Sequence, residues 1–228
     1  MELLLTYTPL LLKGTALTIA VGLTSLVISV VLGLLGAWGK LSRSPAAQGI
    51  AKTYTTIVRG IPDIVLMLLL FYGGQQIINQ IGDYFGWGYI EIDAFTAGVS
   101  TIGFIFGAYM TETFRGAYLA IPAGQVEAGM ACGMSRWTVF RRIIWPQLVR
   151  FALPSFGNNW LVMIKTTALV SIIGLQDVVY LANAAGKSTR QPFTFLFGVL
   201  IIYLILTSVS NAGLNWLERR YNTGYERN

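Results

Sequence analysis

Long runs of residues without a formal charge dominate the sequence. A helix needs about 17–25 predominantly apolar residues to cross the hydrocarbon of a bilayer. Each uncharged run has about this length, and a further run, 151–176, is interrupted only by Lys165; the uncharged runs are 14–39, 64–82, 94–111 and 191–217. The pattern predicts an all-α transmembrane bundle of five spans, at about 10–39, 61–82, 95–118, 151–176 and 192–217.

The segments between these runs are short. Residues 40–59 form the first inner loop, the second outer segment ends near Asp93, and residues 177–192 connect the last two spans on the outer side. The sequence contains no low-complexity stretch and no linker, so residues 1–228 are predicted to form one transmembrane domain. The glycines of the first span (Gly14, Gly22, Gly33, Gly36 and Gly39) are typical of close helix packing in membranes.

Composition agrees with a membrane protein. Hydrophobic residues make up 54% of the chain and charged residues only 11%, whereas soluble domains carry about 25% charged residues. The mean hydropathy is +0.62. The start of the chain has no basic residue before its apolar part, so we expect the first span to act as the insertion signal instead of a cleaved signal peptide.

The basic residues fall mostly on one side of the predicted membrane. Twelve of the sixteen lie in segments that share a side when the five spans alternate, namely Lys40, Arg43, Lys52, Arg59, Arg115, Arg136, Arg141, Arg142, Arg150, Arg219, Arg220 and Arg227. The opposite segments contain Lys13, Lys187 and Arg190, together with Asp83, Glu91 and Asp93. Because basic loops stay in the cytoplasm, we predict the N-terminus outside and the C-terminus inside. The net charge of +6 therefore sets orientation, and we expect no nucleic-acid partner.

Two residue types are scarce. The chain has no histidine and one cysteine, Cys132. An internal disulfide is excluded, and the commonest metal ligand is missing, so we expect no metal site. Nor does the sequence contain a Ser or Cys nucleophile beside a base, so no hydrolase site is expected. We expect Cys132 to be a small packing residue.

Residues 122–146 interrupt the apolar runs with two short predicted helices. Pro122 suits the first position of one helix, which runs to about Cys132 and ends at Gly133. Ser135 is the predicted N-cap of a second helix ending at or before Pro146. On that helix one arc of about 160° is apolar; it contains Trp137, Val139, Phe140, Ile143 and Ile144, and the other side contains Thr138, Arg141 and Arg142.

Periodicity alone leaves two interpretations of this segment open. A basic amphipathic helix can lie on the inner leaflet, anchored by Trp137 and attracted by anionic lipid. Alternatively, its apolar ridge can dock into the groove of a partner protein, with arginines at the rim.

The spacing of residues within this segment resembles a known family signature. Glu127-Ala128, Gly133, Ile143 and Pro146 fit the pattern Glu-Ala-Ala-x3-Gly-x9-Ile-x-Leu-Pro. This is the cytoplasmic loop signature of permeases in bacterial ATP-binding cassette importers. Two positions depart from it, because Gly129 replaces an alanine and Trp145 replaces the leucine.

Further segments resemble the polar amino acid subfamily of these permeases. They are Arg59 to Pro62, Tyr109 to Gly116, Gly157 to Trp160, Lys165 to Ser171 and Leu217 to Tyr221. The resemblance is narrowest to the Q-type subunits of importers for histidine, lysine, arginine and ornithine. It implies a permease that pairs with a second homologous permease, in a heterodimer, within the bacterial inner membrane.

The same resemblance implies the remaining partners. Two cytosolic ATPase subunits would bind ATP and Mg²⁺, a periplasmic binding protein would deliver the amino acid, and this chain would hold no cofactor and perform no catalysis. The segment 122–146 would then be the coupling element that docks on an ATPase; its candidate residues are Glu127, Ala128, Gly129, Gly133, Trp137, Phe140, Arg141, Arg142, Ile143 and Pro146. Ala128, Gly129 and Ala131 would permit close approach of the partner.

Ionisable residues within spans indicate a substrate pathway, because a charge in the membrane is costly unless it faces a cavity or a partner. Glu112 and Lys165 could bind the two ends of an amino acid. The candidate pathway residues are Glu112, Arg115, Asn158, Asn159, Lys165, Thr166 and Ser171. The alternative is structural: Glu112 pairs with Lys165, or with Arg115 one turn away.

Residues 185–189, Ala-Gly-Lys-Ser-Thr, imitate the end of a phosphate-binding loop. The first glycine of that motif would fall on Leu181, so we reject an ATP site here. The predicted function is uptake of a polar, basic amino acid. Two alternatives remain: the same machinery with glutamine, glutamate or an opine as cargo, and a membrane scaffold or channel with an interfacial helix.

Overall fold

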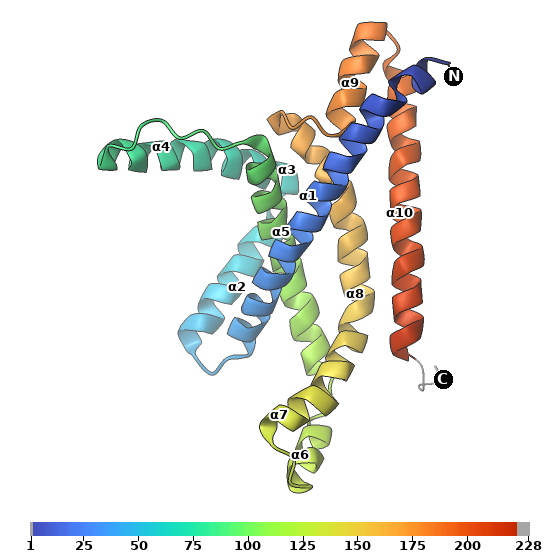
Figure 1. The fold of residues 1–228 in the computed structure, drawn as a ribbon. Helices are drawn as coiled ribbons and strands as arrows, with labels where there is room; N and C mark the ends of the chain where they lie inside the picture. Colours follow the sequence, from blue (N-terminus) through green and yellow to red (C-terminus); the bar gives the residue numbers. More distant parts are fainter. Residues whose placement is uncertain (1, 223–228) are drawn as a thin grey trace.

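The computed structural model describes residues 2–222, so Arg227 lies outside the described residues. Four long helices run lengthwise through the molecule: α1 (Glu2–Leu41), α5 (Ala94–Leu119), α8 (Trp145–Thr166) and α10 (Pro192–Asn222) (Figure 1). The start of α1 lies at one end, beside α9 (Val178–Thr189). The opposite end carries α6 (Ala123–Ala131) and α7 (Arg136–Val139), together with the end of α10.

Within the described residues, five helical segments are long and apolar enough to cross a membrane: Thr6–Leu41, Asp63–Phe85, Ala94–Leu119, Arg136–Ile173 and Pro192–Tyr221. The prediction of an all-α, five-span protein is therefore confirmed. The third span was predicted at 95–118 and its helix differs by one residue at each end.

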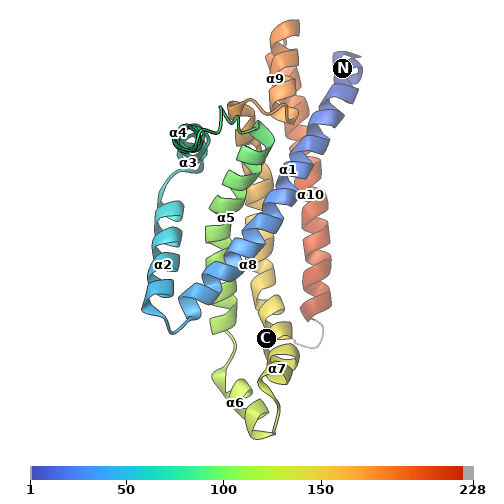
Figure 2. The same cartoon turned by 60° about the vertical axis from the view of Figure 1, so that its left-hand side comes forward.

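The second of these segments differs from the others in direction. Asp63–Phe85 comprises α3 (Asp63–Leu68), the π-helical segment η1 (Leu69–Gly73) and α4 (Gly74–Phe85), and it lies across the four long helices. Figure 2 shows α3 and α4 end-on while the long helices stand upright. The change of direction occurs before Asp63, where Pro62 adopts an extended backbone with ψ 136°.

The chain rises beside α5 through α2 (Pro45–Gly60), which sequence analysis had assigned to an inner loop. Ser44 caps this helix by accepting a hydrogen bond from the Ala47 amide at 3.5 Å, and Pro45 opens it. This helix is amphipathic: Ile50 and Ile57 are 74% and 53% exposed on one side, and Lys52 and Arg59 lie on the other. Its charged side borders the polar cavity described below, which explains why a hydropathy pattern misses it.

The core of the bundle is the packing of α5 against α1. Phe106, Ile102 and Ile105 on α5 are at most 2% exposed. Close approach depends on glycines: a Cβ on Gly103 would lie 2.6 Å from Ile28 Cγ2, and one on Gly107 would lie 2.8 Å from Leu32 Cβ. Small residues thus allow the two backbones to pack closely, as expected for membrane helices.

The end of the molecule that carries the start of α1 also contains a helix that the sequence analysis missed. A 3₁₀ segment, Thr167–Ile173, continues α8 and ends at Gly174 with φ 89°. Asp177 then caps α9, whose buried positions Val178, Ala182 and Ala185 follow helical spacing. The phosphate-loop imitation at 185–189 forms the last turn of this helix, and so it has no loop that could cradle a phosphate.

Candidate functional site

The segment between α5 and α8 folds into a helical hairpin. Its first helix is α6, and its turn contains Gly133 with φ 80°, a conformation that favours glycine. The Ser135 hydroxyl accepts a hydrogen bond from the Thr138 amide at 3.2 Å and begins α7. The predicted turn glycine and second N-cap are confirmed, whereas Pro122, predicted as the first residue of the first helix, is its N-cap.

The predicted end of the second helix at Pro146 is wrong. The helix continues through the π-helical segment η2 (Phe140–Ile144) directly into α8, and Pro146 occupies the first turn of α8. A proline needs no donor of its own in a first turn, and the wider π-helical turn before it accommodates the ring. The hairpin is consequently joined to the fourth span by continuous helix.

Gly129 lies at the packing contact between the two arms of the hairpin. A Cβ at this position would lie 2.7 Å from Ile143 Cδ1 and 3.3 Å from Val139 Cγ2. The residue is buried, so its small size permits α6 to pack on η2 instead of admitting a partner. Ala128 and Ala131 are exposed. This packing explains the departure from alanine in the signature.

The single apolar arc predicted for the second helix is divided in two. Val139 is 2% exposed and, with Ile143, faces α6. Trp137, Phe140 and Trp145 form an exposed aromatic row whose successive ring centroids lie 5.7 and 6.2 Å apart. The π-helical residues shift the register between the two sets. The arginines Arg136, Arg141 and Arg142 are exposed on the surface of the hairpin.

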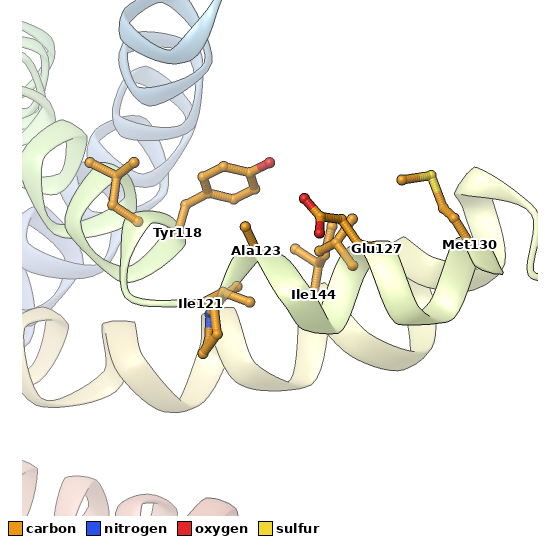
Figure 3. A pocket seen from close by; sticks show the side chains of 9 residues that line it. Tyr118, Ile121, Ala123, Glu127, Met130 and Ile144 are labelled. Atoms are coloured by element: carbon orange, nitrogen blue, oxygen red, sulfur yellow. The ribbon is translucent and has the colours of Figure 1, made fainter. Parts of the chain in front are cut away.

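An open groove of about 560 Å³ lies where α5 meets α6. Figure 3 shows Tyr118, Ala123, Glu127 and Met130 along its length, with Ile121 and Ile144 beside them. Its lining is mostly apolar, and Glu127 supplies a carboxylate that takes part in neither ion pair of the described residues. The groove therefore offers an apolar contact surface with one negative charge.

The hairpin projects beyond the ends of α1 and α10 in both views (Figures 1 and 2). A helix lying on the inner leaflet would instead remain level with the ends of the spanning helices. Cys132, predicted to pack internally, is exposed at the turn of this projection. The geometry favours the docking interpretation over the lipid interpretation.

The second candidate region is the C-terminal half of α5. Glu112 forms an ion pair with Lys40 at the end of α1 and a second with Arg115, at 3.0 Å between Nε and Oε2. The side chain of Glu112 is 21% exposed and that of Lys40 is 14% exposed. The predicted Glu112–Arg115 pair is confirmed. The alternative Glu112–Lys165 pair is wrong, because Lys40 occupies the second position beside the carboxylate.

Two polar cavities of about 480 and 520 Å³ meet at Glu112, Tyr109 and Arg59. Asn158 and Asn159 line the larger cavity, and Asn159 donates a hydrogen bond to Thr113 Oγ1 at 3.0 Å. The structure thus brings Glu112 together with both asparagines. Arg115 adjoins the region through its ion pair with Glu112.

Three candidate pathway residues lie elsewhere. Lys165 is exposed on α8 and lines neither polar cavity. Thr166 donates to the Val162 carbonyl at 3.1 Å, and Ser171 donates to the Ala168 carbonyl at 2.8 Å. Their hydroxyls are satisfied within their own helix.

Sequence reasoning missed Arg59, Tyr109 and Lys40 as members of this region. The Arg59 guanidinium lies 5.3 Å from the centre of the Tyr109 ring, within the range of a cation–π contact. Arg59 ends a helix whose polar residues Lys52, Thr55 and Thr56 line the same cavity. The signal available in the sequence was the helical spacing of these residues.

Comparison with protein families adds independent information. The model of a family described as "Binding-protein-dependent transport system inner membrane component" matches residues 29–223. The chain is 50% identical over 221 residues to the histidine/lysine/arginine/ornithine transport system permease protein HisQ of Escherichia coli strain K12, with 97% of each chain covered. It is 40% identical over 218 residues to the octopine transport system permease protein OccQ of Rhizobium meliloti, covering 95% of this chain and 92% of that protein.

The fold also matches a solved structure. The crystal structure of an amino acid ABC transporter with histidines contains a chain with a TM-score of 0.81 and 32% identity, covering 95% of this chain and 96% of that one. The match extends over nearly the whole chain.

Proposed function

This chain belongs to the family of inner membrane components of binding-protein-dependent transport systems, and from that membership we propose that it is the permease subunit of an ATP-driven importer of basic amino acids. Relatives that are permeases for histidine, lysine, arginine and ornithine, and for octopine, support an amino acid cargo. The chain is not itself catalytic.

The observation that carries the proposal is the projecting hairpin. It is fixed internally by the packing of Gly129 against Ile143, and it continues as unbroken helix into the fourth span. A displacement at its tip would therefore reach α8 and the polar cavity that α8 lines. This is the mechanical property that a coupling element needs.

The hairpin also has surfaces suited to a protein partner. The groove at Tyr118, Glu127 and Met130 and the exposed row of Trp137, Phe140 and Trp145 combine apolar contact area with charge. Aromatic residues and arginine are enriched in protein interfaces. We propose that a cytosolic ATPase docks here, and that ATP and Mg²⁺ bind on that partner chain.

The remaining assembly follows from the family. We propose a bacterial inner-membrane location, an outer N-terminus, a second homologous permease and a periplasmic binding protein that delivers the cargo. Within residues 2–222, most basic residues belong to the segments at the end of the bundle that carries the hairpin. This distribution supports the proposed orientation. Glutamine, glutamate or an opine would use the same machinery.

Substituting the turn glycine tests the coupling assignment. In Gly133→Val a branched side chain would have to adopt φ 80°, which is strained, so the tip of the hairpin changes shape while the spans remain intact. We expect at least a tenfold loss of ATP-dependent arginine uptake in proteoliposomes containing the whole complex, and weaker retention of the ATPase on the tagged permease. Glu127→Ala should reduce both by a smaller factor.

Gly49→Ala is the matched control, because Gly49 lies in α2 and a Cβ there meets nothing within 4 Å. Equal uptake in all three variants, with the ATPase retained, would remove the hairpin as the coupling element. Competition of labelled arginine uptake by unlabelled histidine, glutamine and octopine then separates basic amino acids from the other cargoes.

A further inference from the structure

Lys40 brings a cation from the last turn of α1 to the polar cavity that α2 and α5 also line. Its side chain is only 14% exposed, and its ammonium group pairs with Glu112 Oε1. A lysine on a helix surface normally extends its ammonium group into water. The low exposure of Lys40 therefore indicates a specific contact with Glu112 at the cavity wall.

Both oxygens of the Glu112 carboxylate are engaged within the chain. Lys40 pairs with Oε1, and the Arg115 guanidinium donates a hydrogen bond to Oε2 at 3.0 Å. The two cations differ in position, because Lys40 lines the cavity of about 480 Å³ and Arg115 lines neither polar cavity. Removing the Lys40 ammonium would thus open the Glu112 carboxylate toward the cavity.

The lining of the two polar cavities carries an excess of positive charge. Among the described lining residues, three basic side chains, Lys40, Lys52 and Arg59, stand against the single carboxylate of Glu112, which gives a net charge of +2. Lys52 and Arg59 take part in neither ion pair of Glu112. Because like charges at short range disfavour each other, a further cation would be repelled here. The cavities suit an uncharged or anionic group better than an ammonium or a guanidinium.

The packing of α1 against α5 holds Lys40 beside Glu112. Gly36 lies one turn before Lys40, and a Cβ on Gly36 would overlap the side chain of Thr111, the residue before Glu112. This close approach of the two helices fixes the distance between the ammonium and the carboxylate. A group attached to the same chain competes at an effective concentration on the order of millimolar. Lys40 is therefore a strong competitor of any free cation for Glu112.

We propose that Lys40 is a specificity-determining residue, which occupies Glu112 and excludes the cationic group of the cargo from the polar cavities of this chain. Lys40 fills the position that the ammonium or guanidinium of a basic amino acid would otherwise take beside the carboxylate. The inference rests on the proposed function, because it identifies the part of a basic amino acid that this chain does not bind.

Equilibrium binding of labelled arginine to the purified whole complex, without the binding protein, tests this role. In Lys40→Met the carboxylate of Glu112 keeps Arg115 but opens toward the cavity. We expect arginine to bind about tenfold more tightly, because a charge in contact with a carboxylate changes ionic equilibria by about one to three powers of ten. Lys40→Arg retains the cation and should give no gain. Arg115→Met removes a cation that lines neither cavity and should give none either.

Two further comparisons separate the effect of charge from that of space. Citrulline, the uncharged analogue of arginine, should bind Lys40→Met no more tightly than the unmodified complex. The double variant Lys40→Met/Glu112→Gln should lose the gain for arginine. An equal gain for citrulline, or a gain that persists without the Glu112 carboxylate, would show that the substitution created only space, and either result overturns the proposal.

Lys40→Gln is a second variant that removes the charge while its amide can still donate a hydrogen bond to Glu112. We expect tighter arginine binding in this variant too, with the second permease and the ATPase retained on the tagged chain. Unchanged arginine binding in both variants overturns the proposal, and loss of the complex in both would show that Lys40 is structural. Arginine uptake by the unmodified complex reports separately on the proposed function, so a missing gain with intact uptake refutes the role of Lys40 alone.

Discussion

Glu112 and Asp177 are two carboxylates in different environments: the first is paired with cations and the second is buried without one. Glu112, in the C-terminal half of α5, is flanked by Lys40 and Arg115, with which it forms the two ion pairs of the described residues. Asp177, directly before α9, is fully buried. Its Oδ1 accepts a hydrogen bond from the Tyr180 amide at 2.9 Å, but its Oδ2 has no hydrogen-bond partner within the described part of the chain.

These two residues show separately how ion pairing and burial affect the charged form of a carboxylate. Two cations stabilise the charged form of Glu112, so the carboxylate can remain ionised close to the core. Burial without a cation raises the pKa of Asp177 from 3.8 to about 6, and backbone hydrogen bonds at the start of α9 oppose this only in part. Glu112 therefore joins α5 to α1 through its charge, whereas Asp177 caps the start of α9 alone.

Removing the Glu112 carboxylate should have the largest effect. Glu112→Ala leaves Lys40, which is 14% exposed, without its partner, and we expect a loss of about 2–3 kcal/mol of stability. Because Lys40 and Arg115 already pair with the Glu112 carboxylate, we expect it not to contact the cargo directly. Uptake of cationic and neutral amino acids should therefore fall by similar factors in this variant. Thermal denaturation in detergent and uptake assays with both cargo types measure these effects.

Unequal losses of arginine and glutamine uptake would change the interpretation of Glu112. If Glu112→Gln reduced uptake of arginine strongly and that of glutamine little, the carboxylate would contact substrate directly. In that case the ion pairs with Lys40 and Arg115 would have to open during transport.

Asp177→Asn should have a smaller effect of opposite sign above pH 6. Since the pKa is raised on folding, the folded chain binds the proton more tightly, and stability falls as pH rises from about 4 to about 6. The asparagine keeps an acceptor for the Tyr180 amide without a buried charge. We expect the variant to be more stable by about 2 kcal/mol at pH 7.5 and independent of pH between 5 and 7.5.

Asp177→Ala provides the control for capping. It removes the buried charge and the acceptor together, so it should be less stable than Asp177→Asn by about 1 kcal/mol at every pH. A denaturation midpoint of the unmodified chain that does not change between pH 5 and 7.5 would contradict the raised pKa.

Arg115→Met should have the smallest effect. Arg115 is 37% exposed and pairs with Glu112 at a spacing of three residues on one helix, so the pair contributes about 0.5 kcal/mol. Lys40 remains beside Glu112 in this variant. A loss as large as that of Glu112→Ala would show that Arg115, and not Lys40, holds the carboxylate.

Local chemistry explains what could be predicted from sequence. The uncharged run at 94–111 begins at the first residue of α5, Ala94, because the apolar composition that defines the run belongs to the helix itself. Gly133 and Ser135 likewise define the turn and the second start of the hairpin. Such signals need only neighbouring residues to take effect.

Other features depend on residues far apart in the chain. Glu112 forms an ion pair with Lys40, 72 residues away, and not with Lys165, because α1 packs along α5. Gly129 faces Ile143 only once α6 folds back on η2. Likewise, α2 was assigned to a loop because its polar side meets a cavity that α5 and α1 create.

The sequence by itself determined the membrane class of this protein, its long apolar helices and the family signature at Glu127, Gly133 and Pro146, since each depends on composition or on short-range spacing. The tertiary structure alone decided which side chains meet. It placed Asp63–Phe85 across the bundle, divided the hairpin's apolar residues into a packed and an exposed set, and left Asp177 buried without a cation. Burial and ion pairing are properties of packed surfaces, and those surfaces form only when distant segments come together.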